Sequence, residues 1–220
     1  MLNANNAMAL SRGALPMSDA TPVVFVVDDD ISVRESLELM IRFAGWQPRL
    51  FESAQDFLDA PRALVPSCLV LDINLPGLSG LDLQTSLAGE RYNMPIIFIT
   101  GYGDIPRTVR ALKAGAVEFL TKPFNDEVIL AAMADALQSS RVALEGEKNL
   151  RSLLEAYKTL TPREQEIMAS VVSGRLNKLI AADLNISEIT VKAHRGKVMR
   201  KMKARSLADL VKMAALITPA

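Results

Sequence analysis

The stretch Val23-Val24-Phe25-Val26-Val27-Asp28-Asp29-Asp30 decides the fold, because five apolar residues run directly into three aspartates. A short charge-free run of this kind is typical of a strand that is buried on both faces of a parallel sheet. Four more strand-sized runs follow along the chain, and amphipathic stretches separate them. We predict strands at Val23–Val27, Arg49–Phe51, Leu69–Leu71, Ile96–Ile99 and Val117–Leu120, and helices at 32–44, 54–60, 79–88, 106–114 and 125–140.

This alternation predicts an α/β domain with a five-stranded parallel sheet and helices on both of its faces. Right-handed crossovers between the strands favour a flavodoxin-like, doubly wound arrangement. The single cysteine, Cys68, excludes an internal disulfide, and we expect it to be a small core residue. No apolar run approaches the roughly 20 residues of a membrane-spanning helix, and the first residues lack a secretory pattern. We therefore expect a cytoplasmic protein without membrane insertion.

The rest of the chain indicates further segments. Residues 1–21 are rich in Ala, Asn, Ser and Met, so we expect a disordered extension, in which Met17 is an alternative start. A polar, helix-permissive stretch with Gly146 as its breaker favours a helical linker. Thr161-Pro162-Arg163-Glu164 matches a capping box and opens a new domain. The predicted segments are the extension at 1–21, the α/β domain at 22–140, the linker at 141–159 and a small all-α domain at 160–220.

The charge of the chain is unevenly distributed, although its formal net charge is zero. Residues 161–220 contain 11 Lys or Arg and 5 Asp or Glu, whereas residues 1–160 contain 14 and 20. A basic C-terminal part predicts a polyanionic partner such as nucleic acid.

Polar side chains follow four of the five predicted strands at their carboxyl ends. They are Asp28-Asp29-Asp30, Asp72, Thr100-Gly101 and Lys122-Pro123. In a parallel sheet these ends meet at one edge. Clustered carboxylates are stabilised by a cation, and oxygen ligands without His or Cys favour Mg²⁺. The chemistry that fits is phosphoryl transfer to a carboxylate, with Mg²⁺, Lys122 and Thr100 interacting with the phosphoryl oxygens.

A single aspartate after a strand has a structural alternative, because Asp is a common helix N-cap. Asp30 fits that role, and Asp19, Asp104 and Asp126 are expected to be turn or cap residues. The conjunction of polar groups at four strand ends is much harder to explain by capping.

Residues 23–140 resemble the receiver domain of two-component systems. The motifs that carry the resemblance are Val26-Val27-Asp28-Asp29-Asp30, Leu71–Gly80, Phe98–Gly103, Lys113-Ala114-Gly115-Ala116 and Lys122-Pro123-Phe124. Leu75 departs from the usual Met. The resemblance implies that a sensor histidine kinase phosphorylates Asp72, and that the Lys122–Pro123 bond is cis. The further implied roles are Thr100, Lys122 and Asp28 in catalysis; Asp29, Asp72 and the Asn74 carbonyl as Mg²⁺ ligands; Thr100 and Phe119 as switch residues; and Val109 and Lys113 as dimer contacts.

The basic C-terminal domain has the pattern of a helix-turn-helix. We predict helices at 162–172, 176–183, 187–203 and 206–217, with Gly174 ending the first and Ser187 capping the third. In the third helix an apolar stripe contains Val191, Val198 and Met202. The residues expected away from this stripe are Lys192, Ala193, Gly196, Lys197, Arg200 and Lys203. Small residues between cations suit a helix that enters the major groove, although a basic face is also typical of a solvated helix.

This domain resembles the LuxR-type helix-turn-helix of NarL/FixJ response regulators. The matching stretches are Leu160–Glu164, Gly174–Ala181 and Ile186–Arg195. The receiver motifs resemble the FixJ branch. The DNA contacts implied by the resemblance and the helix pattern are Thr190, Lys192, Ala193, Arg195, Gly196, Lys197 and Arg200. The dimer contacts implied in the last helix are Leu207, Leu210 and Val211, for which packing onto the domain core is the alternative.

The sequence thus predicts a transcription regulator that is not an enzyme beyond its own phosphotransfer and autodephosphorylation. Phosphorylation is expected to promote a homodimer that binds double-stranded promoter DNA. A phosphatase with an aspartate nucleophile is a rival hypothesis, but its common form needs a second Asp where Asn74 stands. Two further hypotheses are that the C-terminal helices recruit a protein instead of DNA, and that the receiver works without phosphate.

Overall fold

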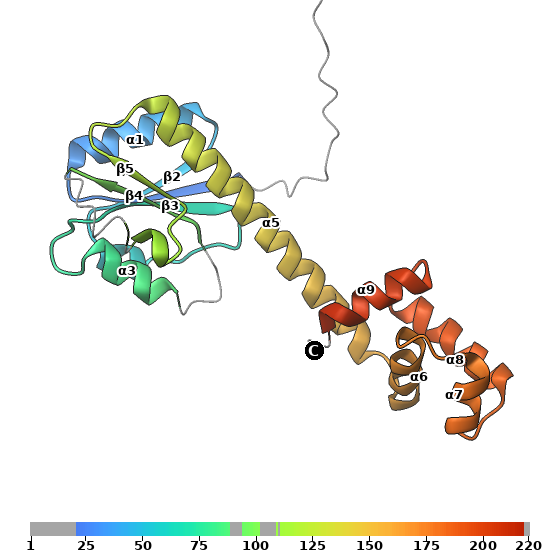
Figure 1. Ribbon diagram of the computed structural model, residues 1–220. Helices are drawn as coiled ribbons and strands as arrows, with labels where there is room; N and C mark the ends of the chain where they lie inside the picture. Colours follow the sequence, from blue (N-terminus) through green and yellow to red (C-terminus); the bar gives the residue numbers. More distant parts are fainter. Residues whose placement is uncertain (1–20, 89–93, 102–108, 110, 218–220) are drawn as a thin grey trace, which may run out of the picture. The chain divides into compact units, whose positions relative to one another are not determined.

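The computed structural model describes residues 21–88, 94–101, 109 and 111–217. The described residues form two compact units, which divide between Arg141 and Val142. The division falls within one long helix, α5 (Asp126–Lys158). We describe the two units separately (Figure 1).

The N-terminal unit is built on a five-stranded parallel sheet with the order β2-β1-β3-β4-β5. The strands are β1 (Val23–Val27), β2 (Gln47–Phe51), β3 (Ser67–Asp72), β4 (Ile96–Thr100) and β5 (Glu118–Thr121). This order is that of the flavodoxin-like doubly wound fold, so the predicted fold class is confirmed. The order reverses between β1 and β3, and such a point is where open α/β sheets bind ligands.

Two hydrophobic cores lie on opposite faces of this sheet. Alternate residues of β1 enter different cores: Val23, Phe25 and Val27 pack with α2 (Ala54–Asp59) and α3 (Gly80–Leu87). Val24 and Val26 pack with α1 (Ile31–Phe43) and the first part of α5. Figure 1 shows α1 and α5 on one side of the sheet and α3 on the other. Because β1 is buried on both faces, its sequence is an uninterrupted apolar run instead of an alternating one.

The helix boundaries follow from local capping. Asp30 caps α1 by accepting a hydrogen bond from the main-chain N–H of Ser32, as the structural alternative for this residue predicts. Ser53 and Ser79 cap α2 and α3 in the same way. Cys68 is buried in the core, and this burial raises the pKa of its thiol to about 12. In the predicted helix 106–114, Val109 and Ala111–Lys113 are helical, and the remaining positions before them lie outside the described residues.

The predicted fifth helix and the predicted linker form one continuous helix. The 33 residues of α5 include Gly146, which therefore does not break the helix. A Cβ at Gly146 would meet nothing within 4 Å, so no close contact explains a glycine at this position.

The C-terminal unit contains α6 (Pro162–Val172), α7 (Asn177–Asp183), α8 (Glu188–Lys201) and α9 (Leu207–Ile217), together with the end of α5. Both hydrogen bonds of the predicted capping box are present between Thr161 and Glu164. Gly174 follows α6 with a φ of 80°, a conformation that glycine adopts without strain. A single core joins these helices through Leu160, Ile167, Ile180, Val191, Val198 and Leu210.

Candidate functional site

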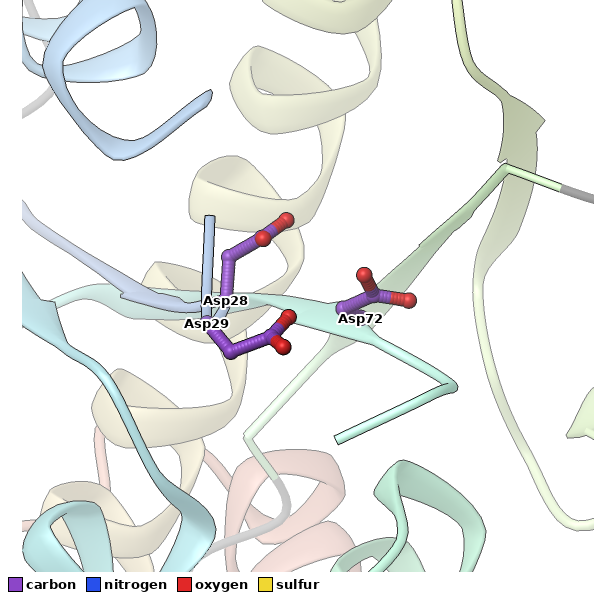
Figure 2. A group of neighbouring side chains, drawn as sticks. All are labelled: Asp28, Asp29 and Asp72. Atoms are coloured by element: carbon purple, nitrogen blue, oxygen red, sulfur yellow. The ribbon is translucent and has the colours of Figure 1, made fainter. Parts of the chain in front are cut away.

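Three carboxylates meet at the carboxyl edge of the sheet. Asp28 and Asp29 follow β1 and Asp72 ends β3, and carboxylate oxygens of the three lie within 4.8 Å of one another (Figure 2). Asp28 and Asp72 are buried, whereas Asp29 is exposed. This set of hard oxygen donors, open to solvent on one side, fits a divalent cation such as Mg²⁺.

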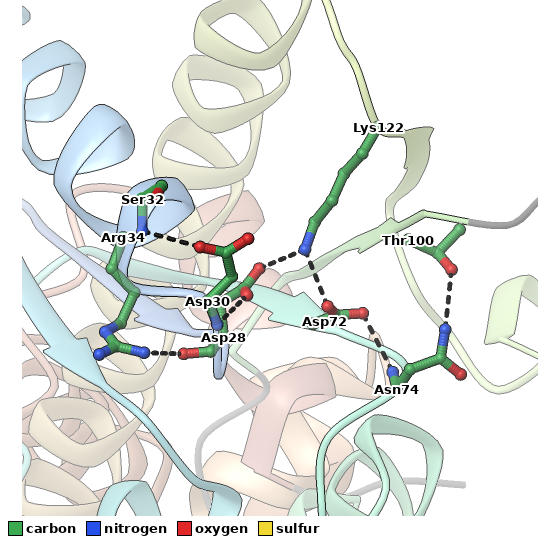
Figure 3. Close-up of polar contacts among 8 residues, drawn as sticks. All are labelled: Asp28, Asp30, Ser32, Arg34, Asp72, Asn74, Thr100 and Lys122. Carbon is green, nitrogen blue, oxygen red and sulfur yellow. Dashed lines mark hydrogen bonds and ion pairs between the residues drawn. The ribbon is translucent and has the colours of Figure 1, made fainter.

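Lys122, which directly follows the edge strand β5, bridges two of these carboxylates. Its Nζ donates to Asp28 Oδ2 at 2.6 Å and to Asp72 Oδ2 at 2.8 Å (Figure 3). Burial lowers the pKa of Lys122, but the hydrogen bonds to Asp28 and Asp72 outweigh it and the pKa is raised. The ammonium therefore stays charged beside the carboxylates. The Lys122–Pro123 peptide bond that follows is cis, as predicted.

The environment of Asp28 disfavours the ionised form of its carboxyl group. Burial raises the pKa of Asp28 above its ordinary value, and the hydrogen bonds from Lys122 and from the Asp30 N–H only partly oppose this. The Asp30 N–H donates to Asp28 Oδ1 at 2.9 Å. A cation bound nearby would favour the ionised form of Asp28 for the same electrostatic reason as Lys122 does.

The loop after β3 places Asn74 between Asp72 and Thr100. The main-chain N–H of Asn74 donates to Asp72 Oδ1 at 3.0 Å, and its side-chain amide donates to Thr100 Oγ1 at 3.4 Å. Thr100 is buried at the end of β4, and the contact with Asn74 places its hydroxyl at the same edge as the carboxylates (Figure 3). The six residues predicted for the pocket thus gather at one edge of the sheet. Asp28 and Asp29 follow β1, Asp72 ends β3, Asn74 follows β3, Thr100 ends β4 and Lys122 follows β5.

Gly80 is packed against the main chain of Asp72. A Cβ at Gly80 would lie 2.3 Å from the Asp72 carbonyl oxygen, a distance that real Cβ atoms do not show. The Gly80 N–H donates to the carbonyl of Ile73 at 3.1 Å. The first turn of α3 can therefore approach the end of β3 only because residue 80 has no side chain.

Phe119, the predicted switch residue, lies on β5 and is half-buried. It packs against the core that contains α2 and α3. The structure thus brings the pocket residues together. Phe119 packs as a core strand residue does, and its role as a switch stays a prediction.

Sequence reasoning missed Arg34, which lies on α1 and binds the pocket loop from outside. Its Nη1 donates to the main-chain carbonyl of Asp28 at 2.5 Å. A charged residue in the first turns of an amphipathic helix gives no signal of such a contact, because solvated helix faces carry the same residues.

The turn between α7 and α8 is fixed by local and long-range hydrogen bonds. Asn185 has a φ of 51°, and Ser187 caps α8 by accepting from the main-chain N–H of Thr190. The Arg163 guanidinium, from α6, donates to the Leu184 carbonyl at 2.6 Å. Two helices joined by this short turn have the helix-turn-helix arrangement, in which the second helix is the one that enters DNA.

The faces of α8 are those that the sequence predicts. Val191, Val198 and Met202 are buried in the core. The exposed residues are Lys192, Ala193, Gly196, Lys197 and Arg200. A Cβ at Gly196 would meet nothing within 4 Å, so space within the domain does not require glycine there. The predicted end at 203 is wrong, because α8 ends at Lys201 and Lys203 has a left-handed φ of 57°.

Arg195 and Thr190, two of the predicted DNA contacts, are half-buried instead of exposed. Arg195 donates to the Asn177 side chain at 3.3 Å, which links α8 to the start of α7. The Thr190 hydroxyl is 2.8 Å from that of Ser187. Both side chains thus have partners within the helix-turn-helix.

Two family models match successive parts of the chain. The family described as "Response regulator receiver domain" matches residues 24–134, and "Bacterial regulatory proteins, luxR family" matches residues 158–214. The nodulation protein W of Bradyrhizobium diazoefficiens is 52% identical over 203 residues, which cover 92% of this chain and 89% of that protein. The transcriptional regulatory protein FixJ of the same organism is 39% identical and covers 87% of this chain and 93% of its own.

The chain is a response regulator of the NarL/FixJ family. A solved structure of the response regulator StyR has a TM-score of 0.80 and 45% identity, covering 89% of this chain and 98% of that one. Full-length FixJ from B. japonicum has a TM-score of 0.54 and 38% identity, covering 88% and 96%. The response regulator has a receiver domain followed by a LuxR-type DNA-binding domain. Among its described residues, no helix is both long and apolar enough to cross a membrane.

The predicted dimer contacts of this response regulator divide into exposed and buried residues. Val109 and Lys113 are exposed, and so are Leu207 and Val211 at 39% each. Leu210 is fully buried in the core of the LuxR-type domain. The prediction for Leu210 is therefore corrected: its side chain packs onto its own domain and is not accessible to a partner.

A partly buried ion pair joins α6 to the end of α8 in the LuxR-type domain. Lys201 Nζ donates to Glu164 Oε2 at 2.6 Å and to the Thr159 carbonyl at 2.8 Å, and the Glu164 side chain is 4% exposed. The hydrogen bond from Lys201, followed by that from the Thr161 N–H, lowers the pKa of Glu164 below its ordinary value of 4.5. The pair therefore favours the ionised form of Glu164.

Lys201→Met is expected to destabilise the LuxR-type domain by about 2 kcal/mol, a value between those for exposed and buried ion pairs. Because the folded-state pKa of Glu164 is lowered, this stabilisation is present above pH 4.5 and is lost as the pH falls through the folded-state pKa. Thermal unfolding followed by circular dichroism at about pH 7 and about pH 3 tests this. The difference between the native chain and the variant should shrink at the lower pH, and a difference independent of pH would contradict it.

Proposed function

We propose that this response regulator is switched by Mg²⁺-dependent phosphorylation of Asp72, with a sensor histidine kinase as the phosphoryl donor. The main observation in support is that Lys122 bridges the carboxylates of Asp28 and Asp72, and that the carboxylate of Asp29 lies beside them. This arrangement supplies a nucleophile, a fixed positive charge and a set of cation ligands within one pocket. The domains we propose are the receiver at 22–140, the helical linker at 141–159 and the LuxR-type domain at 160–220.

In the proposed transfer, a carboxylate oxygen of Asp72 attacks the phosphorus, and the imidazole of the phosphohistidine leaves. Asp72 Oδ1 and Oδ2 now accept hydrogen bonds from the Asn74 N–H and from Lys122. Lys122 keeps its charge and is placed to donate to the phosphoryl oxygens. Thr100, whose hydroxyl faces the same edge, donates to another of them. The chain acts on itself in this step and in autodephosphorylation, and is not an enzyme for another substrate.

The residues present fit Mg²⁺. Asp29, Asp72 and the main-chain carbonyl of Asn74 would hold the ion, and Asp28 would assist. The ion would neutralise charge on the phosphoryl oxygens. Asp29 is suited to this role because it is the exposed member of the cluster, and a Mg²⁺ ion keeps several of its waters.

The proposed output is a homodimer that binds promoter DNA. Acyl phosphate carries a charge of about −2 in place of about −1, so Thr100 and Lys122 have new acceptors to satisfy, and Phe119 moves inward. The surface with Val109 and Lys113 then pairs with a second receiver, with Leu207 and Val211 as further candidates. The two LuxR-type domains of such a dimer present their α8 helices to half-sites about one DNA turn apart. The exposed cations of α8 support this proposal, as does the LuxR-type family match. A DNA-binding regulator of this kind acts in the cytoplasm.

The test is the intact mass of the full chain after incubation with acetyl phosphate and Mg²⁺, beside an Asp72→Asn variant. One added phosphoryl group is expected on the native chain, and none on the variant or in the presence of EDTA. Size-exclusion chromatography of the same samples should show a dimer only where the group is added. Phosphorylation of Asp72→Asn, or uptake that does not depend on Mg²⁺, would contradict the assignment of the site.

A further inference from the structure

The loop between β1 and α1 carries two of the three clustered carboxylates, and it is held on both sides. On the pocket side, Asp28 Oδ1 accepts from the Asp30 N–H at 2.9 Å and Oδ2 accepts from Lys122 at 2.6 Å. On the opposite side, Arg34 Nη1 donates to the main-chain carbonyl of Asp28 at 2.5 Å. Figure 3 shows Arg34 reaching back from α1 to this carbonyl, away from Lys122.

The carbonyl that Arg34 binds belongs to the peptide group between Asp28 and Asp29. Because the peptide is planar, the orientation of this group fixes the direction of the N–Cα bond of Asp29 and so, together with the φ of Asp29, the direction of its side chain. Asp29 is exposed, and within the described part of the chain no side-chain hydrogen bond holds its carboxylate. Its position beside Asp72 (Figure 2) therefore depends on the main chain.

Lys122 neutralises only part of the charge of the three carboxylates, so Asp29 is repelled by the other two whenever no metal cation is bound. Repulsion would turn the exposed Asp29 carboxylate away from those of Asp28 and Asp72. Part of the free energy of cation binding would then be spent on returning Asp29 to the site. A main chain that is already fixed in the binding orientation avoids this cost, as outer partners of ligands do in metal sites.

We propose that Arg34 is a positioning residue for the divalent cation, which acts by fixing the Asp28–Asp29 peptide and not by touching the ion. The inference rests on the proposed function of the pocket. For the loss of Arg34, this inference predicts a change in cation affinity opposite to the change that the loss of its charge alone would cause. A second positive charge near a cation site disfavours the cation, so loss of the charge alone would tighten binding. Loss of the positioning bond weakens it.

The experiment measures binding of Mn²⁺, used in place of Mg²⁺, to the full unphosphorylated chain by electron paramagnetic resonance of the free ion. Arg34→Met keeps an apolar stem but removes the charge and the donor, and it is expected to raise the Kd for Mn²⁺ about tenfold. Arg34→Lys keeps a charged donor. Because Arg34 uses one N–H in this bond, the lysine variant is expected to keep most of the native affinity for Mn²⁺. Arg42→Met is the matched control, because Arg42 lies on the same helix in an exposed pair with Glu38.

A second measurement does not involve a metal. Hydrogen exchange of the Asp30 amide in the metal-free protein is expected to be faster in Arg34→Met than in Arg42→Met, because the loop is then held from one side only. An unchanged or lower Kd for Mn²⁺ in Arg34→Met would overturn the inference, while Mn²⁺ binding by the native chain that is lost in Asp29→Asn would still support the proposed function. Absence of Mn²⁺ binding by the native chain would overturn both.

Discussion

Gly80→Ala is expected to destabilise the receiver domain by about 3 kcal/mol, the upper part of the usual range for a side chain forced into a packed site. The added Cβ would lie 2.3 Å from the Asp72 carbonyl oxygen and 3.1 Å from the Cα of Ile73. The three nearest atoms all belong to the main chain, so the contact cannot be relieved by rotation of a side chain. The end of β3 must shift instead, and it carries the proposed phosphoacceptor. We therefore also expect slower phosphorylation by acetyl phosphate.

Urea unfolding followed by the fluorescence of Trp46 measures this effect, because the one tryptophan of the chain packs in a receiver core. Gly146→Ala is the control, since a Cβ at that position meets nothing within 4 Å and Ala is favoured over Gly in a helix by about 1 kcal/mol. It should leave phosphorylation unchanged. Equal stability and equal phosphorylation of Gly80→Ala and the native chain would contradict the packing argument.

Replacement of Lys192, Lys197 and Arg200 together by Gln is expected to reduce the affinity for DNA by about two orders of magnitude at an ionic strength of about 0.1 M. The three cations are exposed on α8, and each phosphate contact that is lost reduces the slope of log affinity against log salt by about 0.9. The effect on folding should be small, because none of the three is buried in the domain core.

Fluorescence anisotropy with a duplex of mixed sequence measures this slope, since phosphate contacts dominate non-specific binding and no operator is needed. The control removes the same number of charges from α5, by replacement of Lys148, Arg151 and Lys158, which are all exposed. A control that loses as much affinity as the α8 variant would indicate a general charge effect. A native chain whose binding hardly changes with salt would favour the recruitment of a protein.

The sheet and the pocket could be predicted because their signals lie in contiguous sequence. The buried strands are apolar runs, and the polar groups of the pocket directly follow their ends, so the parallel topology alone brings Asp28, Asp72, Thr100 and Lys122 to one edge. The bounds of short strands near polar segments are harder to predict. The structure begins β5 at Glu118 where the sequence predicts Val117.

The contacts that could not be predicted depend on three-dimensional packing. Arg34 binds a main-chain oxygen, and a main-chain partner leaves no trace in the residue types. Leu210 and Val211 are adjacent apolar residues of one helix, and only the docking of α9 decides that the first is buried and the second exposed. The end of α8 depends on a left-handed conformation at Lys203, which lysine rarely adopts, so the residue types offer no reason to end the helix there.

The burial of β1 on both faces has a consequence for the unfolded chain. A stretch of five residues with branched or aromatic side chains, without charge or proline, has the composition of segments that form intermolecular β-structure. In the native sheet both neighbouring strands protect it, but during synthesis and refolding it is exposed. Asp28, Asp29 and Asp30 follow it directly, and charges next to such a segment oppose its self-association. The carboxylates of the pocket thus also limit aggregation before the pocket exists.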